Sequence, residues 1–259
     1  MLRIIICLVL MSVFNAYSAS AGEGTVTGRL QLDNGKALAE GHIFFFDAAS
    51  KLERPVLAKF WRVPDYVEQT TDSGSFTAVL PEGTYYIAAI KRMSDVVVGP
   101  PIDGDYFLPA HDRKGTYRSV TVKDGVVSDI GTIKRIQRYS SRRSAYKGKV
   151  SAIEGKLTRE DGSPVEGMYV FAYTDQTMQG RPQFVSVVSH KDGSYRLLVD
   201  RGRIVYLKTR AAYSGGSPQP GAPIGFYGGA DNPQPVAART DSVVRGVDII
   251  VRPFAQRIN

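Results

Sequence analysis

The sequence predicts an all-β protein built from two tandem Greek-key β-sandwiches of about seven strands each, joined by a basic linker. Three observations indicate this fold. Strand-like alternation fills most of the chain, glycine-containing turns separate the strands at hairpin spacing, and the whole pattern occurs twice. The predicted parts are a signal peptide over 1–21, a first sandwich over 22–136, the linker over 137–149 and a second sandwich over 150–259.

The first 21 residues have the layout of a secretory signal peptide. Met1-Leu2-Arg3 provides a positive start, an apolar run occupies 4–14, and small residues follow. Such a run is far shorter than the roughly 20 residues that a membrane-spanning helix needs. We expect cleavage after Ser18 or Ala21 and an exported mature chain without a transmembrane segment, located in a bacterial periplasm or on the outer surface.

The only cysteine, Cys7, lies inside this apolar run. The mature chain is therefore expected to contain no disulfide, no cysteine-ligated zinc, no covalently attached haem and no thiol nucleophile. The sandwiches must be stabilised by their hydrophobic cores.

Each copy opens with a strand containing glycine, a basic residue and leucine, followed by a turn and an apolar strand. In the first copy these are Gly28-Arg29-Leu30, Asn34-Gly35 and 42–46. In the second copy they are Gly155-Lys156-Leu157, Asp161-Gly162 and 168–173.

A second pair of turns follows in both copies. Ser73-Gly74-Ser75-Phe76 matches Asp192-Gly193-Ser194-Tyr195, and another glycine comes nine residues after each turn glycine, at Gly83 and Gly202. Both of these later glycines are expected to close tight turns with positive φ, where alanine would be strained.

These residues resemble carboxypeptidase-regulatory-like domains, which are prealbumin-type (transthyretin-type) β-sandwiches common in bacterial secreted proteins. The resemblance rests on the segments 71–76 and 80–85 and covers 24–135 and 151–252. The second copy departs from it at 200–203, where the proline and the tyrosine are missing. The resemblance implies the sandwich fold and an accessory role in adhesion, carbohydrate association or surface assembly.

Two long irregular stretches occupy the same place in each copy, at about 94–116 and 213–235. Connections of this length are usually functional or disordered. Their aromatic residues either fold back onto the sandwich ends or contact a ligand. The candidate ligand-binding residues are these aromatics and the single tryptophan: Trp61, Tyr106, Phe107, Tyr213, Phe226 and Tyr227.

Trp61 has two interpretations. If Phe60 faces inward, strand alternation turns Trp61 outward, where its ring could stack on a sugar; in the opposite phase Trp61 lies in the core. A sugar site should gather exposed aromatics with Asp, Asn or Arg in one hollow, whereas scattered aromatics favour contact with a protein.

The positive charge of the chain is concentrated around the linker. The formal net charge is +8, and removal of the signal peptide with Arg3 leaves +7. Residues 134–149 account for that charge, because they contain no acid and seven basic residues: Lys134, Arg135, Arg138, Arg142, Arg143, Lys147 and Lys149. This basic patch either meets an acidic protein, an anionic lipid or an acidic glycan, or is a solvated spacer. Nucleic acid is not expected as a partner of an exported chain.

The sequence contains no recognisable catalytic constellation, metal site or cofactor motif. His42, His111 and His190 are not spaced as zinc ligands. Transthyretin-like hydroxyisourate hydrolases use histidines, an arginine and a C-terminal Tyr-Arg-Gly-Ser, which Tyr117-Arg118-Ser119 matches only in part. We therefore predict a non-enzymatic, exported module of the cell envelope, without a cofactor, that docks to another envelope or surface protein through sheet edges and long loops. The alternative is a polysaccharide-binding protein that uses its loop aromatics.

The basic patch gives a first prediction. Replacing Arg138, Arg142, Arg143 and Lys147 with serine should leave both sandwiches folded and weaken capture of an acidic partner at low salt. The reason is screening, since the Debye length falls from about 10 Å at 0.1 M salt to about 3 Å at 1 M. Binding measured across a salt series tests this. Coincident curves for parent and variant would show that the segment is only a spacer.

Overall fold

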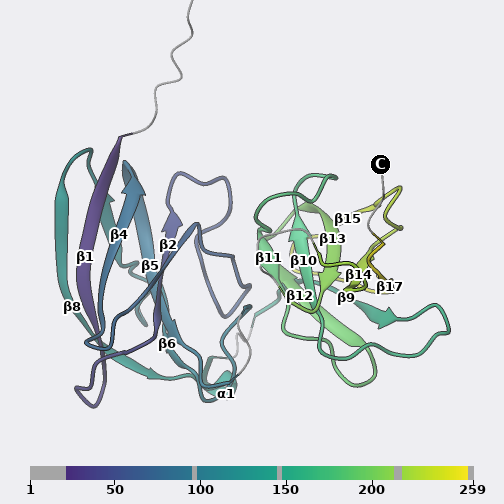
Figure 1. Cartoon of the computed structure of the whole chain (residues 1–259), viewed down its shortest axis with the longest axis horizontal. Helices are drawn as coiled ribbons and strands as arrows, with labels where there is room; N and C mark the ends of the chain where they lie inside the picture. Colours follow the sequence, from purple (N-terminus) through teal and green to yellow (C-terminus); the bar gives the residue numbers. More distant parts are fainter. Residues whose placement is uncertain (1–21, 95–97, 145–147, 213–217, 256–259) are drawn as a thin grey trace, which may run out of the picture.

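A computed structural model describes residues 22–94, 98–144, 148–212 and 218–255 of the chain (Figure 1). The described residues form seventeen strands and one short helix, which confirms the all-β prediction. The proposed signal peptide lies outside the described residues, as do Tyr213 and Lys147. No helix within the described ranges is long and apolar enough to cross a membrane.

The first eight strands form one sheet system, which we call the N-terminal unit. Their order is β3-β2-β5-β6-β8-β1-β4, with β7 paired to β5. Only β1 and β8 are parallel; the other pairs in this unit are antiparallel. The strands are β1 (Glu23–Leu32), β2 (His42–Asp47), β3 (Tyr66–Gln69), β4 (Ser75–Pro81), β5 (Gly83–Lys91), β6 (Tyr106–Leu108), β7 (Ser119–Val122) and β8 (Val127–Arg138).

The remaining nine strands form the C-terminal unit, which follows the helix α1 (Ser141–Ser144). Their order is β11-β10-β13-β14-β17-β9-β12, with β15 paired to β13 and β16 paired to β9. The strands are β9 (Ser151–Thr158), β10 (Tyr169–Tyr173), β11 (Phe184–Val185), β12 (Ser194–Val199), β13 (Ile204–Arg210), β14 (Pro223–Phe226), β15 (Pro235–Ala237), β16 (Val243–Val244) and β17 (Ile249–Pro253).

The repeat in the sequence is a repeat of strand order. Strands β9 to β15 take the places of β1 to β7, and β16 and β17 together take the place of β8. Even the parallel pairing of the first strand with the last is present in both units. The path through each unit contains seven strands, and the short strands β7, β15 and β16 are additional to the number expected.

The described parts of the two long irregular stretches contain short strands that the sequence did not predict. Each contains a short strand in the middle of its unit, because β6 lies between β5 and β8, and β14 lies between β13 and β17. Prolines and glycines around these three- and four-residue strands hide them from pattern analysis. Within the range predicted as linker, β8 continues to Arg138 and α1 follows at Ser141–Ser144.

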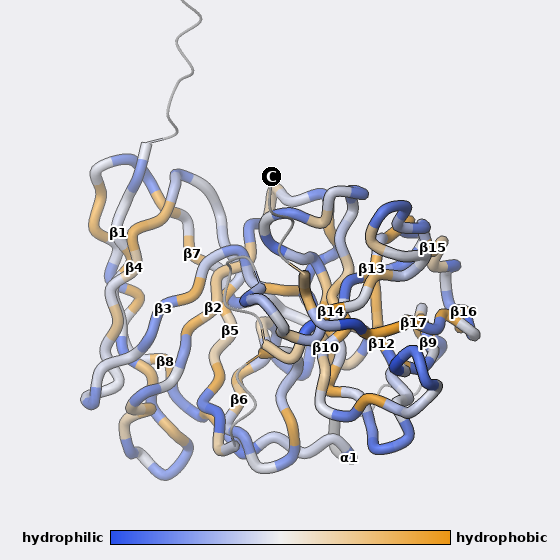
Figure 2. The backbone as a smooth tube through the Cα atoms, turned by 45° about the vertical axis from the view of Figure 1, so that its right-hand side comes forward, coloured by the Kyte–Doolittle hydropathy of each residue, from blue (hydrophilic) through white to orange (hydrophobic). Residues whose placement is uncertain are grey.

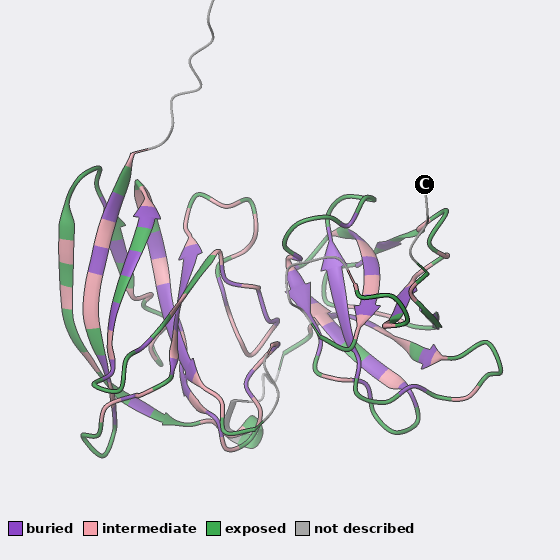
Figure 3. Ribbon diagram, viewed as in Figure 1, coloured by how far each residue is buried: buried purple, intermediate pink, exposed green. Residues whose placement is uncertain are grey.

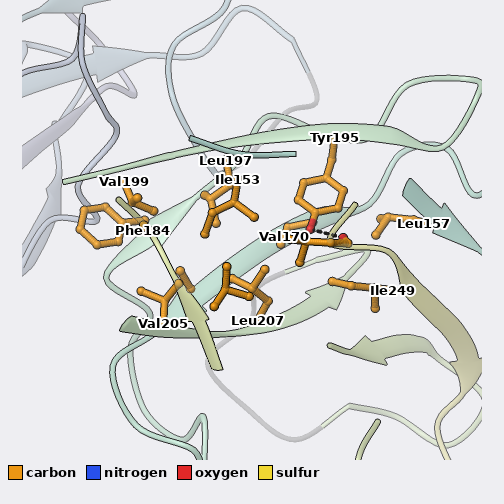
Figure 4. Packing of buried hydrophobic residues seen from close by; sticks show 14 of the residues in the cluster. Ile153, Leu157, Val170, Phe184, Tyr195, Leu197, Val199, Val205, Leu207 and Ile249 are labelled. Carbon is orange, nitrogen blue, oxygen red and sulfur yellow. Dashed lines mark hydrogen bonds between the residues drawn. The ribbon is translucent and has the colours of Figure 1, made fainter. Parts of the chain in front are cut away.

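Each unit has its own hydrophobic core. Hydrophobic residues concentrate in the strands (Figure 2), and buried residues do so too (Figure 3). The N-terminal core includes Ile43, Phe45 and Phe76. The C-terminal core includes Leu197 and Leu207 (Figure 4). The buried hydroxyl of Tyr195 donates a hydrogen bond of 2.7 Å to the carbonyl oxygen of Val247, so it is satisfied without water (Figure 4).

Strands β2 and β10 are buried on both faces. In β2, Ile43 and Phe45 face the N-terminal core, whereas Phe44 and Phe46 face a third cluster. In β10 all five residues are buried, with Val170 and Ala172 in the C-terminal core and the three aromatic residues in the third cluster. Burial on both faces explains why the sequences of these strands are almost continuously apolar.

The prediction for the paired turn glycines is half wrong. Gly202 has a φ of 68°, as expected. Gly83 is the first residue of β5 and is not among the positive-φ residues, and a Cβ atom there would meet only the Tyr85 ring, at 3.6 Å. Alanine should therefore be tolerated at Gly83.

The glycines that the fold does require are Gly74 and Gly193, at equivalent turns. Their φ angles are 77° and 75°, and a Cβ atom would overlap a main-chain oxygen of the neighbouring strand in both cases. We predict that alanine at either position lowers the free energy of unfolding by more than about 1 kcal/mol. Alanine at Gly35, which has a φ of 82° and no atom within 4 Å of the added Cβ, is the control with strain but no overlap. Urea unfolding curves test this, and equal losses at Gly74 and Gly35 would contradict it.

Candidate functional site

The two units share the third hydrophobic cluster, which we call the junction cluster. It joins side chains from β2, β5 and β6 to side chains from β10 and β11. Its buried members are Phe44, Phe46, Trp61, Ala88, Ile90, Phe107, Ala110, Tyr169, Phe171, Tyr173, Met178 and Val185. The outward faces of β2 and β10 are therefore buried against the opposite unit.

The connection between β2 and β3 crosses from the N-terminal unit into the C-terminal unit. Phe60 lies in the C-terminal core, with its ring edge-to-face with Phe184 at 5.8 Å. The main chain continues along β11, where Arg62 and Phe184 form an isolated antiparallel β-bridge. The amide of Val63 donates to the carbonyl of Gln183 at 2.9 Å. This crossing segment covers the edge of β11.

The Asp65 carboxylate is bonded to both units. Its Oδ2 accepts from Arg62 Nη2 at 2.6 Å and from the amide of Asp47 at 2.8 Å. Its Oδ1 accepts from Arg181 Nη2 at 2.5 Å, and Arg181 Nη1 also donates to the carbonyl of Pro64 at 2.7 Å. One carboxylate thus pairs with a guanidinium from each unit.

Arg62 is buried, so its charge requires the carboxylate of Asp65 as a partner. The Arg62 side chain is only 1% exposed, and burial lowers the pKa of its guanidinium while the charge of Asp65 opposes that shift. The guanidinium also lies over the ring of Phe46, at 5.6 Å from the centroid. A buried arginine is stable only while its counter-charge stays in place.

More exposed contacts surround this pair. Arg201 Nε donates to Glu53 at 2.5 Å, and Arg203 Nη2 donates to the carbonyl of Lys51 at 2.7 Å. The amide of Glu53 donates to Asp200 at 3.2 Å. The exposed pair of Arg201 and Glu53 contributes little stability.

A cavity of about 330 Å³ lies where the units meet. Phe44 and Trp61 from the N-terminal unit and Phe171 from the C-terminal unit form aromatic walls. Four polar side chains also line it: His42, Asp65, Arg92 and Arg181. Mostly apolar walls with a few polar groups are typical of ligand pockets. We therefore take this junction cavity as the candidate functional site.

The structure buries Trp61, as the second interpretation predicts, but Phe60 does not face outward as that phase requires. Both Phe60 and Trp61 are buried, at 2% and 7% exposure. Adjacent residues can both be buried because this segment is not a regular strand and passes between two cores, so that Phe60 enters one and Trp61 the other. The Trp61 ring lies edge-on to Phe44, with ring centroids 5.9 Å apart, and its centroid is 6.3 Å from that of Phe107.

The other predicted aromatics are dispersed. Phe107 is buried in the junction cluster, and Tyr106 packs on the N-terminal core beneath the Arg138 guanidinium, 5.0 Å from the ring centroid. Phe226 packs on the junction cluster and Tyr227 on the C-terminal core. Of the predicted aromatics that are described, only Trp61 lines the cavity.

The residues that pattern analysis missed are Phe44, Phe171, Asp65 and Arg181. A signal for the two phenylalanines was present, because the runs containing them do not alternate as a half-buried strand would. Asp65 and Arg181 are 116 residues apart, and nothing local in the sequence predicts that they form an ion pair.

The described members of the basic patch do not lie in one element. Lys134 and Arg135 are exposed on β8, Arg142 is exposed on α1, and Lys149 is exposed before β9. The start of α1 is fixed to the N-terminal unit, because the amide and hydroxyl of Ser141 donate to Asp103 at 2.5 and 3.1 Å. These two bonds lower the pKa of Asp103.

The three histidines are far from forming a common site. His42 lines the junction cavity, and burial, together with the charge of Arg92, lowers the pKa of its imidazole. His111 contacts the carbonyl of Asp112, and His190 is exposed. Within the described part of the chain, no three His, Cys, Asp or Glu side chains are grouped so that they could hold a metal ion.

No family model matches the chain, and no curated protein matches it. Solved structures with some likeness include the TIE protein of Bacillus anthracis, at 11% identity and a TM-score of 0.27, covering 90% of this chain and 34% of that protein. A streptococcal ancillary pilin has 16% identity and a TM-score of 0.27, covering 90% and 63%. A minor pilin of Streptococcus agalactiae has 13% identity and a TM-score of 0.26, covering 91% and 99%.

The chain thus spans about a third of the first of these proteins and less than two thirds of the second.

The ion pairs at the junction give a prediction about stability. Asp65→Asn removes the counter-charge of the buried Arg62 and should lower the free energy of unfolding by about 3 kcal/mol or more. Glu53→Gln breaks the exposed pair with Arg201 across the same junction and should cost under about 1 kcal/mol. Urea unfolding of both variants measures the difference. Equal losses would mean that Asp65 is not the dominant polar contact.

Proposed function

We propose that the chain is a non-enzymatic, exported binding module of the cell envelope, which docks an extended segment of another envelope or surface protein along the edge strand β3. The observation that carries this proposal is the open edge of β3 beside the junction cavity. Strand β3 ends the path of the N-terminal unit and, among the strands that the structure describes, pairs only with β2. The resemblance to carboxypeptidase-regulatory-like domains agrees with an accessory role of this kind.

The hydrogen bonds of β3 indicate which groups point outward. The amide of Thr70, directly after β3, donates to the carbonyl of Gly41 at 2.8 Å. Hydrogen-bonded residue pairs alternate with non-bonded pairs along two antiparallel strands, so the main-chain groups of Glu68 and Tyr66 also point toward β2. The main-chain N–H and C=O groups of Val67 therefore point away from β2, where an added strand could pair with them.

The side chains of this edge also favour docking. Edge strands are usually protected by lysine, proline or inward charges. Val67 is instead 45% exposed and lines the junction cavity. The matching edge in the other unit, β11, is covered by the crossing segment through the bond between Val63 and Gln183. The two units are thus unequal, and β3 is the one of these two equivalent edges that remains accessible.

The chemistry of the cavity supports a binding role over catalysis. Among the described residues that line it there is no serine, threonine, cysteine or lysine to act as a nucleophile. Asp65 and Arg92 are held in ion pairs with Arg62 and Asp105. Polysaccharide binding, the alternative, has less support, because the described aromatics are dispersed and the Trp61 ring is edge-on to a neighbour.

Proline substitution tests the docking strand. Val67→Pro removes an outward N–H group and leaves the pairing of β3 with β2 intact, so the fold should be retained while capture of the partner is lost. The control is Val79→Pro on β4, the other end of the same path. The amide of Leu30 on β1 donates to the carbonyl of Gly74, directly before β4. Since bonded pairs alternate along the antiparallel β1–β4 pair, the amide of Val79 points away from β1, and Val79 is 56% exposed.

The measurement is a pull-down from envelope extract with the immobilised mature protein. The proteins captured by the parent should be captured by Val79→Pro and be absent with Val67→Pro, with circular dichroism showing that both variants are folded. Capture of the same proteins by the parent and Val67→Pro would contradict docking at β3.

A further inference from the structure

The junction cavity has the size and walls of a small-molecule site, separate from strand docking at β3. Its volume of about 330 Å³ lies at the lower end of the range of about 300–1,000 Å³ for ligand pockets. Phe44 and Trp61 come from one unit and Phe171 from the other. The cavity therefore exists only while the two units are joined.

The walls favour a flat aromatic body. Phe44 and Trp61 meet edge-to-face, with an interplanar angle of 77°. Walls of this kind present both ring edges and ring faces, and aromatic rings prefer edge-to-face or offset contacts of that type. Aliphatic side chains, among them Ile90, Val185 and Val67, form further parts of the apolar lining.

The accessible charge at the cavity is positive. Arg181 is 42% exposed, whereas Asp65, its partner, is 13% exposed. Two of the five N–H donors of Arg181 are used by Asp65 and by the carbonyl of Pro64. Arg92 is nearly buried and donates to Asp105, Pro100 and Gly99. A ligand entering the cavity therefore meets the Arg181 guanidinium as its main charged contact.

The remaining polar groups do not oppose an anion. Both oxygens of Asp65 already accept hydrogen bonds from guanidinium groups, so its charge is largely compensated. His42 is half-buried, and burial and the charge of Arg92 lower its pKa, which favours the neutral imidazole, with one donor and one acceptor nitrogen.

We propose that the junction cavity binds a small carboxylate with an aromatic body, an aryl-alkanoate, whose ring lies between Phe44, Trp61 and Phe171 and whose carboxylate pairs with Arg181. Charge-assisted hydrogen bonds to a guanidinium give such a site its preference for an anion over a neutral molecule of the same shape.

The chain provides its own reporter for this site, because Trp61 is its only tryptophan and lines the cavity. The mature protein is titrated with 3-phenylpropanoate and with the neutral 3-phenylpropanamide, following the emission of Trp61. We expect a saturable change with the carboxylate and at least about tenfold weaker binding of the amide, the ratio that about 1.4 kcal/mol produces. No saturable change with the carboxylate, or equal affinities for the two molecules, would overturn the proposal.

Two variants then locate the anion contact. Arg181→Gln should remove the preference for the carboxylate. Arg201→Gln should keep it, since Arg201 forms another ion pair across the junction but does not line the cavity. Retention of the preference in a folded Arg181→Gln protein would also overturn the proposal. If that variant does not fold, the comparison of the two ligands on the parent protein decides. Strand docking is tested separately, since neither ligand bears on pairing at β3.

Discussion

The ion pair between Arg62 and Asp65 is the constraint on which the junction depends. A guanidinium that is 1% exposed has lost almost all of its hydration, and removing its counter-charge would leave an uncompensated buried charge. Asp65 in turn is fixed by the amide of Asp47 at the end of β2 and by Arg181 of the C-terminal unit. The crossing segment is therefore fixed at a point that both units share.

Several features follow from the position of this segment. Phe60 and Trp61, which directly precede Arg62, are held in two different cores. The bond from Val63 to Gln183 covers the edge of β11. The same geometry leaves the hollow between the units open beside Val67. An accessible edge and an apolar cavity thus lie next to each other. Because both units line the cavity, the affinity for a ligand there depends on how the units are joined.

The sequence predicted the strands and turns better than the relation between the units. The turn glycines Gly74 and Gly193 and the repeated strand order follow from local patterns. The strands β6 and β14 did not, because three or four residues between prolines and glycines give too weak a pattern. The error at Gly83 arose because the matching glycine, Gly202, is in a turn with positive φ, whereas Gly83 itself is extended.

The site could not have been predicted from spacing alone. In a strand with one buried face, apolar runs such as those of β2 and β10 would indicate only a strong core. Their second buried faces create the junction cluster. Arg181 and Asp65 come from different units and are 116 residues apart. An ion pair between such distant residues produces no periodic pattern in the sequence. What the sequence did contain was the absence of alternation in these two strands.

In this account the junction is the point that holds the two units together, through the shared cluster and the Asp65 ion pairs, so the units should tumble as one body. Measurement of ¹⁵N relaxation for backbone amides in the strands of both units tests it most directly. If the claim is right, the amides of β1 to β8 and those of β9 to β17 report one common rotational correlation time, that of the whole mature chain. Two different and shorter correlation times, one for each unit, would show that the units tumble independently and would contradict the account.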